Sequence, residues 1–572
     1  MVLSGMLDAV RGKARARLLR AVTVGRVALQ TGLARELRSA GALTLLGAVG
    51  QANQSLVFRF HAANQPLRTA LVHGARRLSY LEADEHMDRV AAALGARGIG
   101  AGDVVALMLG NVPEFLFTQI GAGRLGAAVV NASWRSTPAE LEHLLGNSGA
   151  RALFVGAGVA QVVSRLPGAV RAALGERVFT VGGEVAGLAT YEQLVAGAGV
   201  PSSSRRWLRG RSRLAEQAAV VVYTSGTTGK PKGAVRRFGR DALTPIFGFI
   251  GETPMRAGGV HVAVCPLYHS TAFAFVGLTH LLGGQVVLLD RFEPEGLLDA
   301  LQRHGAHHTA LVPTMLHRLV ELGEPAVRAR DLSALQAIFV GGAPLRPALC
   351  EQAMRLFGDR LYNFYGATET GLVTLAGPAD LRAAPGTIGR CVVGNEIRLL
   401  AESGRECAPG EVAELYVRSS NLVAGYHRDD RATQEAMRAG FFSVGDLGRR
   451  DERGYYFLTG RKRDMIISGG VNVYPVEIED VLCAHPAVAE AAVVGVPDEE
   501  WGERVRAFVV RKPGAACEAQ ELIEHCRGRL AGPKVPREVV FVASLPRTAT
   551  GKVEKNKLRE LGPQREVAGG RG

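Results

Sequence analysis

The most informative stretch of the sequence is YTSGTTGKPKG, residues Tyr223–Gly233, which directly follows the apolar run 218–222. Glycine and small hydroxyl residues let backbone N–H groups approach phosphate oxygens closely, and serine, threonine and lysine side chains add donors and charge. It is not a Walker A loop, because Thr224 stands where that motif has its first glycine and Pro231 follows Lys230. A plain turn between strands is the alternative. The pattern favours a phosphate-binding loop made of Thr224, Ser225, Gly226, Thr227, Thr228, Gly229 and Lys230.

Around this loop, apolar runs of strand length alternate with helical patterns from about residue 70 to residue 340. Such alternation is typical of α/β sheets covered by helices. We therefore predict an α/β fold for the large N-terminal part of the chain. The strand-like runs include 104–108, 152–155, 218–223, 260–264 and 286–289, and the helix-like stretches include 80–97 and 293–304.

The pattern changes after Ala384, where short strand-like runs with turn signals such as Pro409–Gly410 predict an antiparallel, β-barrel-like subdomain. Beyond Gly460 a helix that begins at Pro475 opens a new series of elements. A separate α+β domain of about 100 residues is predicted there, which is an ordinary size for a domain. Its other expected elements are strands over 491–496, 505–510 and 539–542 and a helix over 518–530.

The chain of 572 residues has a formal charge of +14, and the excess is spread unevenly. Residues 1–50 hold eight Arg and Lys against two acidic residues, and five arginines lie between Arg205 and Arg213. Neither cluster carries a platform of stacking aromatic residues, and no helix-turn-helix, RRM or zinc-finger pattern occurs, so nucleic acid is excluded as a partner. The seven cysteines form no CxxC pair, which argues against a disulfide or zinc framework and favours a cytoplasmic protein.

The N-terminal segment alternates basic and apolar residues. It predicts either an amphipathic helix in which residues 1–40 contact an anionic membrane surface, on the inner face of the membrane, or a helix packed on the body of the protein. It lacks the compact apolar core and cleavage site of a signal peptide. The charge-free stretch Ala257–Leu289 is interrupted by Pro266 and several histidines, so we expect a buried strand, loop, helix and strand rather than a transmembrane helix.

The sequence resembles an AMP-forming acyl-CoA synthetase of the adenylate-forming (ANL) superfamily, in particular the long-chain fatty acid–CoA ligases, over residues 62–558. No single motif carries the resemblance, because each alone would be weak. The motifs follow the family's order after the phosphate-binding loop: PLYH (266–269), GGAP (341–344), YGATE (365–369), GD (445–446), GR (460–461), SGGVNVYP (468–475) and PRTATGK (546–552).

The resemblance implies that a carboxylate attacks the α-phosphate of ATP, releases pyrophosphate and leaves an acyl adenylate, from which coenzyme A displaces AMP. It also implies Mg²⁺. Residues 224–230 would hold the β- and γ-phosphates, Thr368 would contact the α-phosphate, and Glu369 would bind Mg²⁺, which prefers hard oxygen ligands. Lys552 would stabilise the charge that develops as the adenylate forms. A surface acid at Glu369 and an exposed loop cation at Lys552 are the alternatives.

By the same resemblance, Tyr365 would stack on adenine with Gly366 beside it, and Asp446 would accept hydrogen bonds from both ribose hydroxyls. Arg461 would contact the ribose or the phosphates. The alternatives are a core tyrosine at position 365 and a turn aspartate at position 446, since tyrosines are often buried and Asp after Gly is common in turns.

His269 would gate the acyl pocket or protect the adenylate, although a lone histidine in an apolar region is more often a core residue. Gly342 and Ala343 would form part of the wall between adenine and the acyl group. Gly469 and Gly470 would help to form the passage for the pantetheine arm of coenzyme A, or would be a plain turn.

Members of the family rotate their small domain about a hinge after the Gly-Arg pair. Two further departures from the family pattern, at residues 236–238 and 532–534, are not expected to touch the core chemistry. The predicted segments are a basic N-terminal segment 1–50, a large AMP-binding domain 51–460, a hinge 461–464, a small mobile domain 465–560 and a tail 561–572.

The acid is predicted from composition only. An uncharged wall with Phe273, Phe275 and Leu278, and the lack of a cation to pair with a second carboxylate, favour a medium- to long-chain fatty acid. An aryl, steroidal or terpenoid acid is an alternative substrate, and an acyl carrier protein is an alternative acceptor to coenzyme A. The sequence leaves the oligomeric state open.

Overall fold

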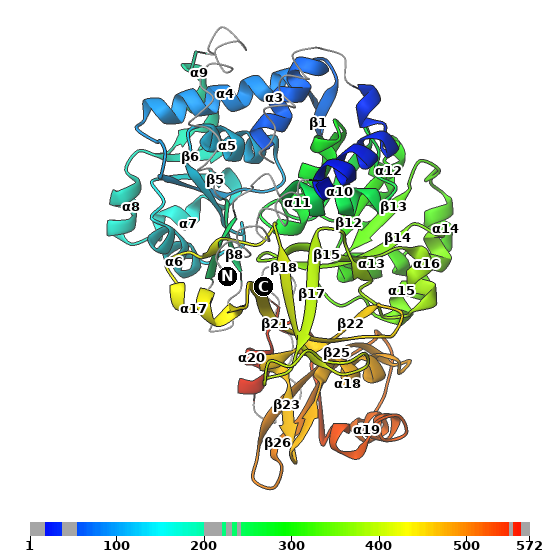
Figure 1. The fold of residues 1–572 in the computed structure, drawn as a ribbon. Coiled ribbons are helices and arrows are strands. Elements are labelled where there is room, and N and C mark those ends of the chain that lie inside the picture. The colour runs from blue at the N-terminus through cyan, green and yellow to red at the C-terminus, as the bar shows by residue number, and fades with distance from the viewer. Residues whose placement is uncertain are drawn as a thin grey trace, which may run out of the picture.

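The computed structural model describes residues 18–36, 54–199, 220–224, 232–236, 242–547 and 553–561. Figure 1 shows a broad upper body and a smaller lobe below it, with the strands β21 (Phe441–Arg450) and β22 (Tyr456–Arg461) between them. Of the predicted site residues, Ser225–Lys230 and Lys552 lie outside the described residues, and Thr224 is described by its backbone alone.

Within the described residues, the first sheet has nine strands in the order β16-β15-β14-β13-β12-β10-β11-β1-β2. The neighbours from β14 through β1 pair in parallel, so their carboxyl ends lie along one edge of the sheet. The bounds are β1 (Thr69–His73), β2 (Arg76–Ser79), β10 (Val260–Ala263), β11 (Gln285–Leu288), β12 (His308–Leu311), β13 (Ala337–Val340), β14 (Leu361–Ala367), β15 (Gly371–Ala376) and β16 (Arg390–Cys391).

The second sheet has eight strands in the described part of the chain, in the order β19-β9-β8-β4-β3-β5-β6-β7. The strands from β8 through β7 pair in parallel, and β9 and β19 add an antiparallel edge. The bounds are β3 (Val104–Met108), β4 (Ala128–Asn131), β5 (Ala152–Gly156), β6 (Val178–Val181), β7 (Ala189–Thr190), β8 (Val220–Thr224), β9 (Lys232–Arg236) and β19 (Gly425–Tyr426).

The antiparallel section expected after Ala384 is present as a third sheet, in which β17 (Asn395–Leu400), β18 (Ala413–Ser419), β21 and β20 (Met437–Arg438) pair in that order and β22 also pairs with β21. The lobe has a fourth sheet built on the long antiparallel pair β25 and β26. Its strands are β23 (Ile466–Ser468), β24 (Val471–Val473), β25 (Val488–Asp498), β26 (Gly502–Arg511) and β27 (Glu538–Phe541).

Helices cover the sheets of the upper body and flank the sheet of the lobe (Figure 1). In the upper body they are η1 (Leu33–Glu36), α3 (Gln54–Asn64), α4 (Tyr80–Ala96), α5 (Pro113–Arg124), α6 (Pro138–Ser148), η2 (Ala157–Val159), α7 (Gln161–Ser164), α8 (Gly168–Leu174), α9 (Tyr191–Ala196), α10 (Leu243–Gly251), α11 (Ser270–Leu281), α12 (Pro294–Arg303), α13 (Pro313–Glu321), α14 (Gly323–Arg328), α15 (Pro347–Phe357), α16 (Pro378–Ala383) and α17 (Asp430–Ala436). After β22 follow η5 (Lys462–Asp464), α18 (Pro475–Cys483), α19 (Ala519–Arg527), η6 (Gly532–Lys534) and α20 (Lys555–Glu560).

The α/β fold predicted from the sequence is confirmed, and several elements begin where local signals place them. The apolar run 104–108 is β3. Pro475 is the first residue of α18, where its missing N–H costs nothing because no helical acceptor exists there. The uncharged stretch after Ala257 forms β10, α11 and β11, and none of the helices in the described ranges has the length and apolar character needed to cross a membrane.

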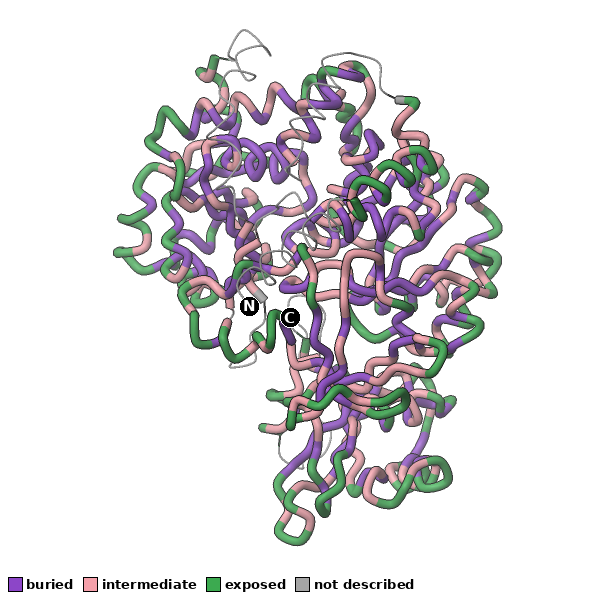
Figure 2. Tube along the Cα trace, viewed as in Figure 1, coloured by how far each residue is buried: buried purple, intermediate pink, exposed green. Residues whose placement is uncertain are grey.

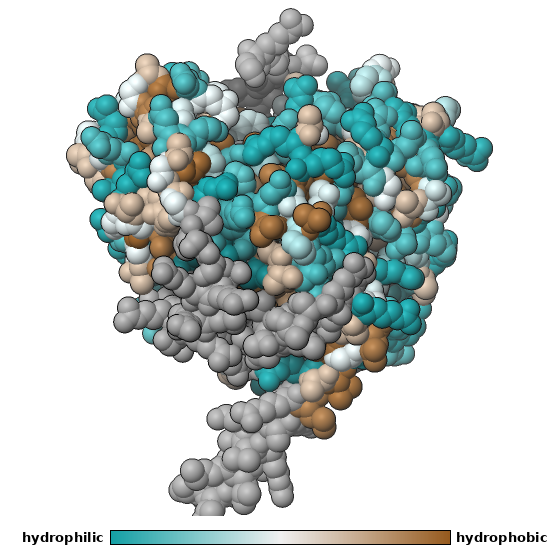
Figure 3. Space-filling model, turned by 90° about the horizontal axis from the view of Figure 1, so that it is seen from above, coloured by the Kyte–Doolittle hydropathy of each residue, from teal (hydrophilic) through white to brown (hydrophobic). Residues whose placement is uncertain are grey.

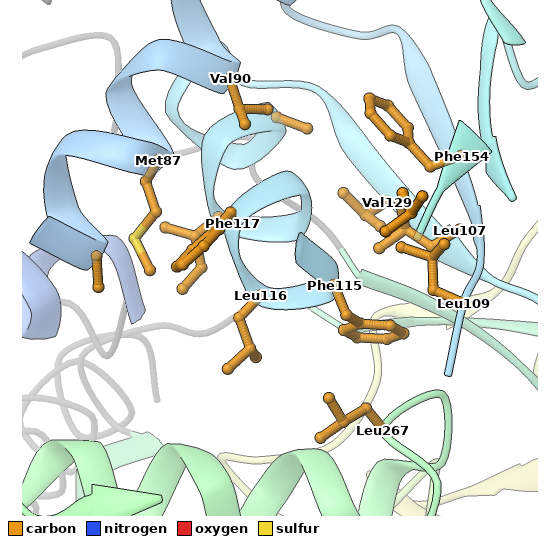
Figure 4. Packing of buried hydrophobic residues seen from close by; sticks show 14 of the residues in the cluster. Met87, Val90, Leu107, Leu109, Phe115, Leu116, Phe117, Val129, Phe154 and Leu267 are labelled. Atoms are coloured by element: carbon orange, nitrogen blue, oxygen red, sulfur yellow. The ribbon is translucent and has the colours of Figure 1, made fainter. Parts of the chain in front are cut away.

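The core that joins the two parallel sheets is built on α5, whose residues are nearly all buried. Phe115 and Phe117 are fully buried, and side chains from α4, β3 and β5 surround them (Figure 4). Burying one such ring contributes about 2–3 kcal/mol. Helices α4 and α5 approach so closely that a methyl group on Gly121 would lie 2.9 Å from the carbonyl oxygen of Met87. Figure 2 shows that burial is densest in the sheets and lowest in the outer loops.

A helix over residues 18–30 lies on the surface beside α10 (Figure 1). Val27 is fully buried against aromatic residues of α10, and Gln30 donates a hydrogen bond to the carbonyl oxygen of Gly251 at 3.0 Å. The opposite face exposes 66% of Leu18, 58% of Val22 and 75% of Leu29. In the view from above, hydrophobic side chains gather at the lower edge of the molecule, in the region of this helix (Figure 3). The prediction of a helix packed on the body is therefore confirmed for one face, while the other face is apolar and exposed.

Candidate functional site

The predicted nucleotide-binding residues follow the carboxyl ends of parallel strands from both sheets. Thr224 is the last residue of β8, and the GGAP motif begins directly after β13. Tyr365 and Gly366 lie near the C-terminal end of β14. In α/β folds, ligands bind at this edge because the loops that leave the strands there converge. Within the first sheet, the neighbouring strands β13 and β14 therefore bring the GGAP loop and Tyr365 to the same edge.

The GGAP loop needs its glycines for different reasons. A methyl group on Gly341 would lie 2.5 Å from the ring of Phe364, so only hydrogen fits between β13 and β14. Gly342 has φ +81°, a left-handed conformation that disfavours other residues. Gly342 and Ala343 are exposed. Their predicted place in a wall beside the nucleotide stays a prediction.

Thr368 and Glu369 lie in the turn between β14 and β15, and side-chain and backbone contacts hold it. The hydroxyl groups of Ser270 and Thr368 are 3.2 Å apart. The Tyr426 hydroxyl donates to Glu369 Oε1 at 3.0 Å, and Val423 N–H donates to the Glu369 carbonyl oxygen at 2.9 Å. Glu369 is 6% exposed, so the alternative of a surface acid is wrong. A buried carboxylate next to a threonine hydroxyl is suited to a phosphate and its metal ion.

Tyr365, Asp446 and Arg461 form a second cluster, drawn from β14, β21 and β22. The Tyr365 hydroxyl donates to Asp446 Oδ2 at 2.8 Å, and Arg461 Nε donates to Oδ1 at 3.1 Å. Asp446 lies directly opposite Arg461 in a strand pair, so the alternative of a turn aspartate is wrong. Burial raises the pKa of the Tyr365 hydroxyl well above its usual value, and the negative charge of Asp446 raises it further. The tyrosine therefore stays neutral and keeps donating to the carboxylate.

His269 precedes α11 at its N-cap position, and its ring centre lies 4.2 Å from that of Tyr268. It is half-buried, and the next residue, Ser270, contacts Thr368. The alternative of a core histidine is therefore wrong for His269. Fully enclosed histidines of this region include His280 on α11, and His261 and His308, whose Nδ1 atoms are 3.0 Å apart.

Only part of the predicted acyl wall lies outside the hydrophobic core, where it could contact a substrate. Phe275 is fully buried and Leu278 is 5% exposed, and both pack in the cluster formed by α10, β13 and β14. That part of the prediction is wrong, because two of the three side chains point into the core. Phe273 is half-buried on another face of α11, which it shares with Ser270, Ala274 and Gly277.

In the lobe, Gly469 and Gly470 are the two-residue turn between β23 and β24, with φ values of +57° and +77°. Gly469 N–H donates to the carbonyl oxygen of Trp501 at 2.8 Å, and a methyl group on Gly469 would lie 2.7 Å from the Trp501 ring. The turn interpretation is confirmed. A role for these glycines in binding coenzyme A stays a prediction.

The described residues on either side of Lys552 are held by specific contacts. Arg547 and Val553 pair as an antiparallel bridge, and Arg547 forms an ion pair with Glu490 at 2.7 Å. Lys555, at the start of α20, forms an ion pair with Glu479 of α18 at 2.7 Å. In Figure 1, α20 lies at the end of the lobe nearest the upper body. Arg547 and Val553, which flank the undescribed residues 548–552, are therefore held to the lobe.

An ion pair crosses between the upper body and the lobe. Arg346 Nε, just after the GGAP loop, lies 3.6 Å from Asp480 Oδ1 of α18. Burial raises the pKa of Asp480 to about 6, and Arg346 opposes the shift. The charge on this carboxylate, and with it the pair, therefore changes near neutral pH.

Sequence reasoning missed Arg236. Its guanidinium Nη2 donates to the Thr368 carbonyl oxygen, so this residue of the departure at 236–238 contacts a predicted site residue. Whether it affects the core chemistry is not tested by this contact, and that expectation stays a prediction. Burial lowers the pKa of Arg236 to about 10, and Glu369 opposes the shift, so the side chain remains a cation at neutral pH. A charged residue in the strand that directly follows the phosphate-binding loop was the available signal. Tyr426, which contacts Glu369, had no sequence signal.

The residues fit a magnesium ion that arrives with a nucleotide. Mg²⁺ is usually held by one or two carboxylates together with phosphate oxygens. Glu369 is one buried carboxylate next to the hydroxyl of Thr368. In the part of the chain that the structure describes, no group of three or more His, Cys, Asp or Glu side chains could hold a metal by itself.

Comparison with known proteins agrees with this geometry. Residues 58–427 match the family described as AMP-binding enzyme, and residues 477–552 match the AMP-binding enzyme C-terminal domain. The chain is 35% identical over 507 residues to an indoleacetate–CoA ligase of Aromatoleum aromaticum, which covers 88% of this chain and 96% of that protein. It is 33% identical over 533 residues to a long-chain-fatty-acid–CoA ligase of Salmonella typhimurium, with 89% and 94% covered.

Among solved structures, ATP-bound MatB from Rhodopseudomonas palustris superposes with a TM-score of 0.78 at 30% identity, covering 89% of this chain and 98% of that one. The matches span the upper body and the lobe, and the relatives are named CoA ligases. The chain therefore belongs to the AMP-binding enzyme family and is an acyl-CoA synthetase of the adenylate-forming superfamily.

Proposed function

We propose that this protein uses ATP to convert a carboxylic acid into an acyl adenylate, with release of pyrophosphate, and then transfers the acyl group to coenzyme A. The observation that carries the proposal is the presence of two side-chain clusters at the end of β14. One contains Thr368 and Glu369, and the other contains Tyr365, Asp446 and Arg461. The first suits phosphates, and the second suits a nucleoside.

In this proposal each cluster has a distinct task. Asp446 accepts hydrogen bonds from the two ribose hydroxyls, a role for which a carboxylate with two acceptor oxygens is suited. Thr368 donates its hydroxyl to the α-phosphate. Glu369 holds Mg²⁺, which, when bound, neutralises phosphate charge that would otherwise repel the attacking carboxylate. Two anions must meet for the reaction, so positioned cations and donors supply most of the rate enhancement.

The second domain completes the site. In this proposal Lys552 adds a compact ammonium charge where the bridging oxygen departs. On either side of it, Arg547 pairs with Val553 and Lys555 forms an ion pair with Glu479. Thioester formation then needs space for the coenzyme A thiol at the same carbonyl carbon. The turn at Gly469 and Gly470 is our proposal for the group that lines the thiol's approach after the lobe has rotated about residues 461–464.

The acid we favour is a medium- to long-chain fatty acid. The half-buried face of α11 that starts at Ser270, beside Thr368, continues through Phe273 and Ala274 to Gly277 and carries no charge. The relatives favour no single class, because they include a ligase named for indoleacetate and one named for long-chain fatty acids. An aryl, steroidal or terpenoid acid is therefore the second candidate.

A panel of acids with pyrophosphate release as the readout separates these candidates. We expect the highest kcat/KM with unbranched acids of eight or more carbons. Ala274→Phe should then lower activity with the longest chains and leave the shortest accepted chain within twofold, because the added ring narrows that face of α11. A preference for aryl acids, with fatty acids at background, would contradict the fatty-acid assignment while leaving the adenylation chemistry intact.

The acceptor is tested separately. We expect purified enzyme, acid, ATP and coenzyme A to yield AMP and acyl-CoA with no carrier protein present. Release of AMP only when a phosphopantetheinylated carrier protein is added would instead identify the protein as an acyl-AMP ligase that loads a carrier.

The exposed apolar face of helix 18–30 supports a peripheral contact with an anionic membrane as part of this function. Leu18, Val22 and Leu29 share one side of the helix, and the segment 1–50 is rich in arginine. Such a contact would place the enzyme where apolar acids partition.

A further inference from the structure

The turn that carries Thr368 and Glu369 is braced from a different sheet than the one that forms it. Its strands β14 and β15 belong to the first sheet, whereas Arg236 and Tyr426 come from β9 and β19 at the edge of the second sheet. Arg236 donates to the Thr368 carbonyl oxygen, and Tyr426 donates to Glu369 Oε1 at 3.0 Å. The two contacts act on the two residues whose groups face the phosphates in the proposed function.

The guanidinium fits this turn closely. Besides the contact to Thr368, Nη1 would lie 3.4 Å from a methyl group built on Gly371, the first residue of β15, which is van der Waals contact. Gly371 has φ +76°, a backbone conformation that disfavours a side chain there. The planar group therefore lies along the turn from Thr368 to Gly371.

A backbone carbonyl held by a guanidinium is a strong contact, because hydrogen bonds with a charged partner contribute roughly twice as much as neutral ones. The backbone of Arg236 is also held by its neighbouring strands, because Val235 pairs with Gly425 of β19 and Arg236 pairs with Val220 of β8. The strand that follows the phosphate-binding loop is thereby tied to the turn that follows β14. Movement of one would shift the other.

We propose that Arg236 is a positioning residue for adenylation, which sets the orientation of the Thr368 hydroxyl and the Glu369 carboxylate toward the triphosphate and its Mg²⁺. The inference rests on the proposed function and adds a residue to it. Arg236 acts through the turn and not on the reacting atoms, so its loss should weaken the magnesium-dependent part of nucleotide binding more than the binding of the nucleoside.

The test compares Arg236→Met with wild type and with Arg453→Met. Arg453 also donates to a backbone carbonyl, that of Ala383 at 3.1 Å, in another region. It controls for the loss of an arginine-to-carbonyl contact, although unlike Arg236 it is exposed. We expect Arg236→Met to lower kcat for pyrophosphate release by about 10- to 100-fold, the usual range for losing one charge-assisted hydrogen bond. Arg236→Lys, which keeps one charged donor, should recover at least a third of that loss on a logarithmic scale.

A second measurement separates a positioning role from a general structural one. It is the binding of α,β-methylene-ATP, measured by calorimetry with and without Mg²⁺. In wild type, Mg²⁺ should tighten binding. In Arg236→Met, affinity without Mg²⁺ should stay within twofold of wild type, while the gain on adding Mg²⁺ falls at least fivefold. A gain equal to that of wild type, or a larger one from removing a competing cation, would overturn the inference. An equal loss of affinity in both conditions would also overturn it, as a general loss of structure.

The outcome is distinguishable from failure of the proposed function. If wild type releases no pyrophosphate with any acid of the panel, the proposed function fails. If wild type is active and Arg236→Met matches it in rate and in magnesium response, only the role of Arg236 fails.

Discussion

Replacing Asp446 by asparagine tests the nucleoside end of the site. One carboxylate oxygen accepts from Arg461 at 3.1 Å and the other from Tyr365 at 2.8 Å, and 10% of the side chain is exposed. An amide of the same shape keeps one acceptor oxygen and turns the other into a donor. We therefore expect Asp446→Asn to fold normally and to lose one of its two contacts with the ribose hydroxyls.

The size of the effect follows from these contacts. A hydrogen bond to a charged group contributes about 1.5–3 kcal/mol, so the KM for ATP should rise about 10- to 150-fold. The cost in stability is smaller. Arg461 keeps 34% of its side chain exposed and can turn to water, which limits the loss from the ion pair to about 1 kcal/mol. Tyr365 can still donate to the amide oxygen.

The assay is acid-dependent pyrophosphate release with ATP and with 2′,3′-dideoxy-ATP. If Asp446 binds the ribose hydroxyls, wild type prefers ATP strongly, and the asparagine variant loses most of that preference. The ratio of kcat/KM values for the two nucleotides should fall at least tenfold. The comparison isolates the pairwise contact, because any general damage to the site affects both nucleotides.

Asp380→Asn is a matched control. Asp380 of α16 accepts from the Tyr455 hydroxyl at 2.8 Å and lies 3.7 Å from Arg390, the same three residue types in another part of the upper body. This variant should leave the preference for ATP unchanged. If Asp446→Asn instead raised the KM for both nucleotides by one common factor, the assignment of Asp446 to the ribose would be refuted.

Three further predictions follow from other parts of the molecule. Lys552→Ala should abolish adenylation and leave ATP binding mostly intact in calorimetry, and unchanged pyrophosphate release would disprove its role. Because burial raises the pKa of Asp480 to about 6, its folded-state pKa exceeds the ordinary value, and the associated stability is present below about pH 4 and lost as the pH rises through 6. Asp480→Asn should therefore melt slightly higher than wild type at pH 7.5, by no more than about 1 kcal/mol because 42% of the side chain is exposed. The difference should shrink as the pH falls below 6 and vanish near pH 4, and a difference of the same size at pH 7.5 and pH 4 would contradict this. Replacing Leu18, Val22 and Leu29 together by serine should weaken co-sedimentation with vesicles of 30% phosphatidylserine at least fivefold. Pyrophosphate release in solution should stay unchanged. A change of oligomeric state with no effect on vesicle binding would instead identify a second copy of the chain as the partner of this face.

Local patterns in the sequence were sufficient for the elements and for the order of the motifs. The run 104–108 is a strand because a buried parallel strand needs a continuous apolar stretch, and Pro475 begins a helix because its ring fits the first helical position. The roles of Thr368 and Glu369 came from the resemblance of the YGATE motif to the family, and not from local chemistry. The strand and helix signals lie within a few neighbouring residues, so they can be recognised without the fold.

Contacts between segments far apart in the chain could not be predicted from local sequence patterns. Phe275 and Leu278 were expected beside the substrate, yet they pack in the core, because the sequence of α11 is apolar on several faces and does not state which face meets the sheet. Arg236 was dismissed for a similar reason. Its role depends on a carbonyl group 132 residues away, and a carbonyl has no side-chain signature.

From the sequence alone came the α/β class, which is confirmed, and the phosphate-binding loop, which stays a prediction, because both rest on neighbouring residues along the chain. Only the tertiary structure decided that Asp446 meets Tyr365 and Arg461, that Tyr426 contacts Glu369, and that one face of helix 18–30 is left uncovered. The physical reason is that strand pairing and sheet packing set these distances, and both are decided by the burial of the whole chain rather than by any one segment.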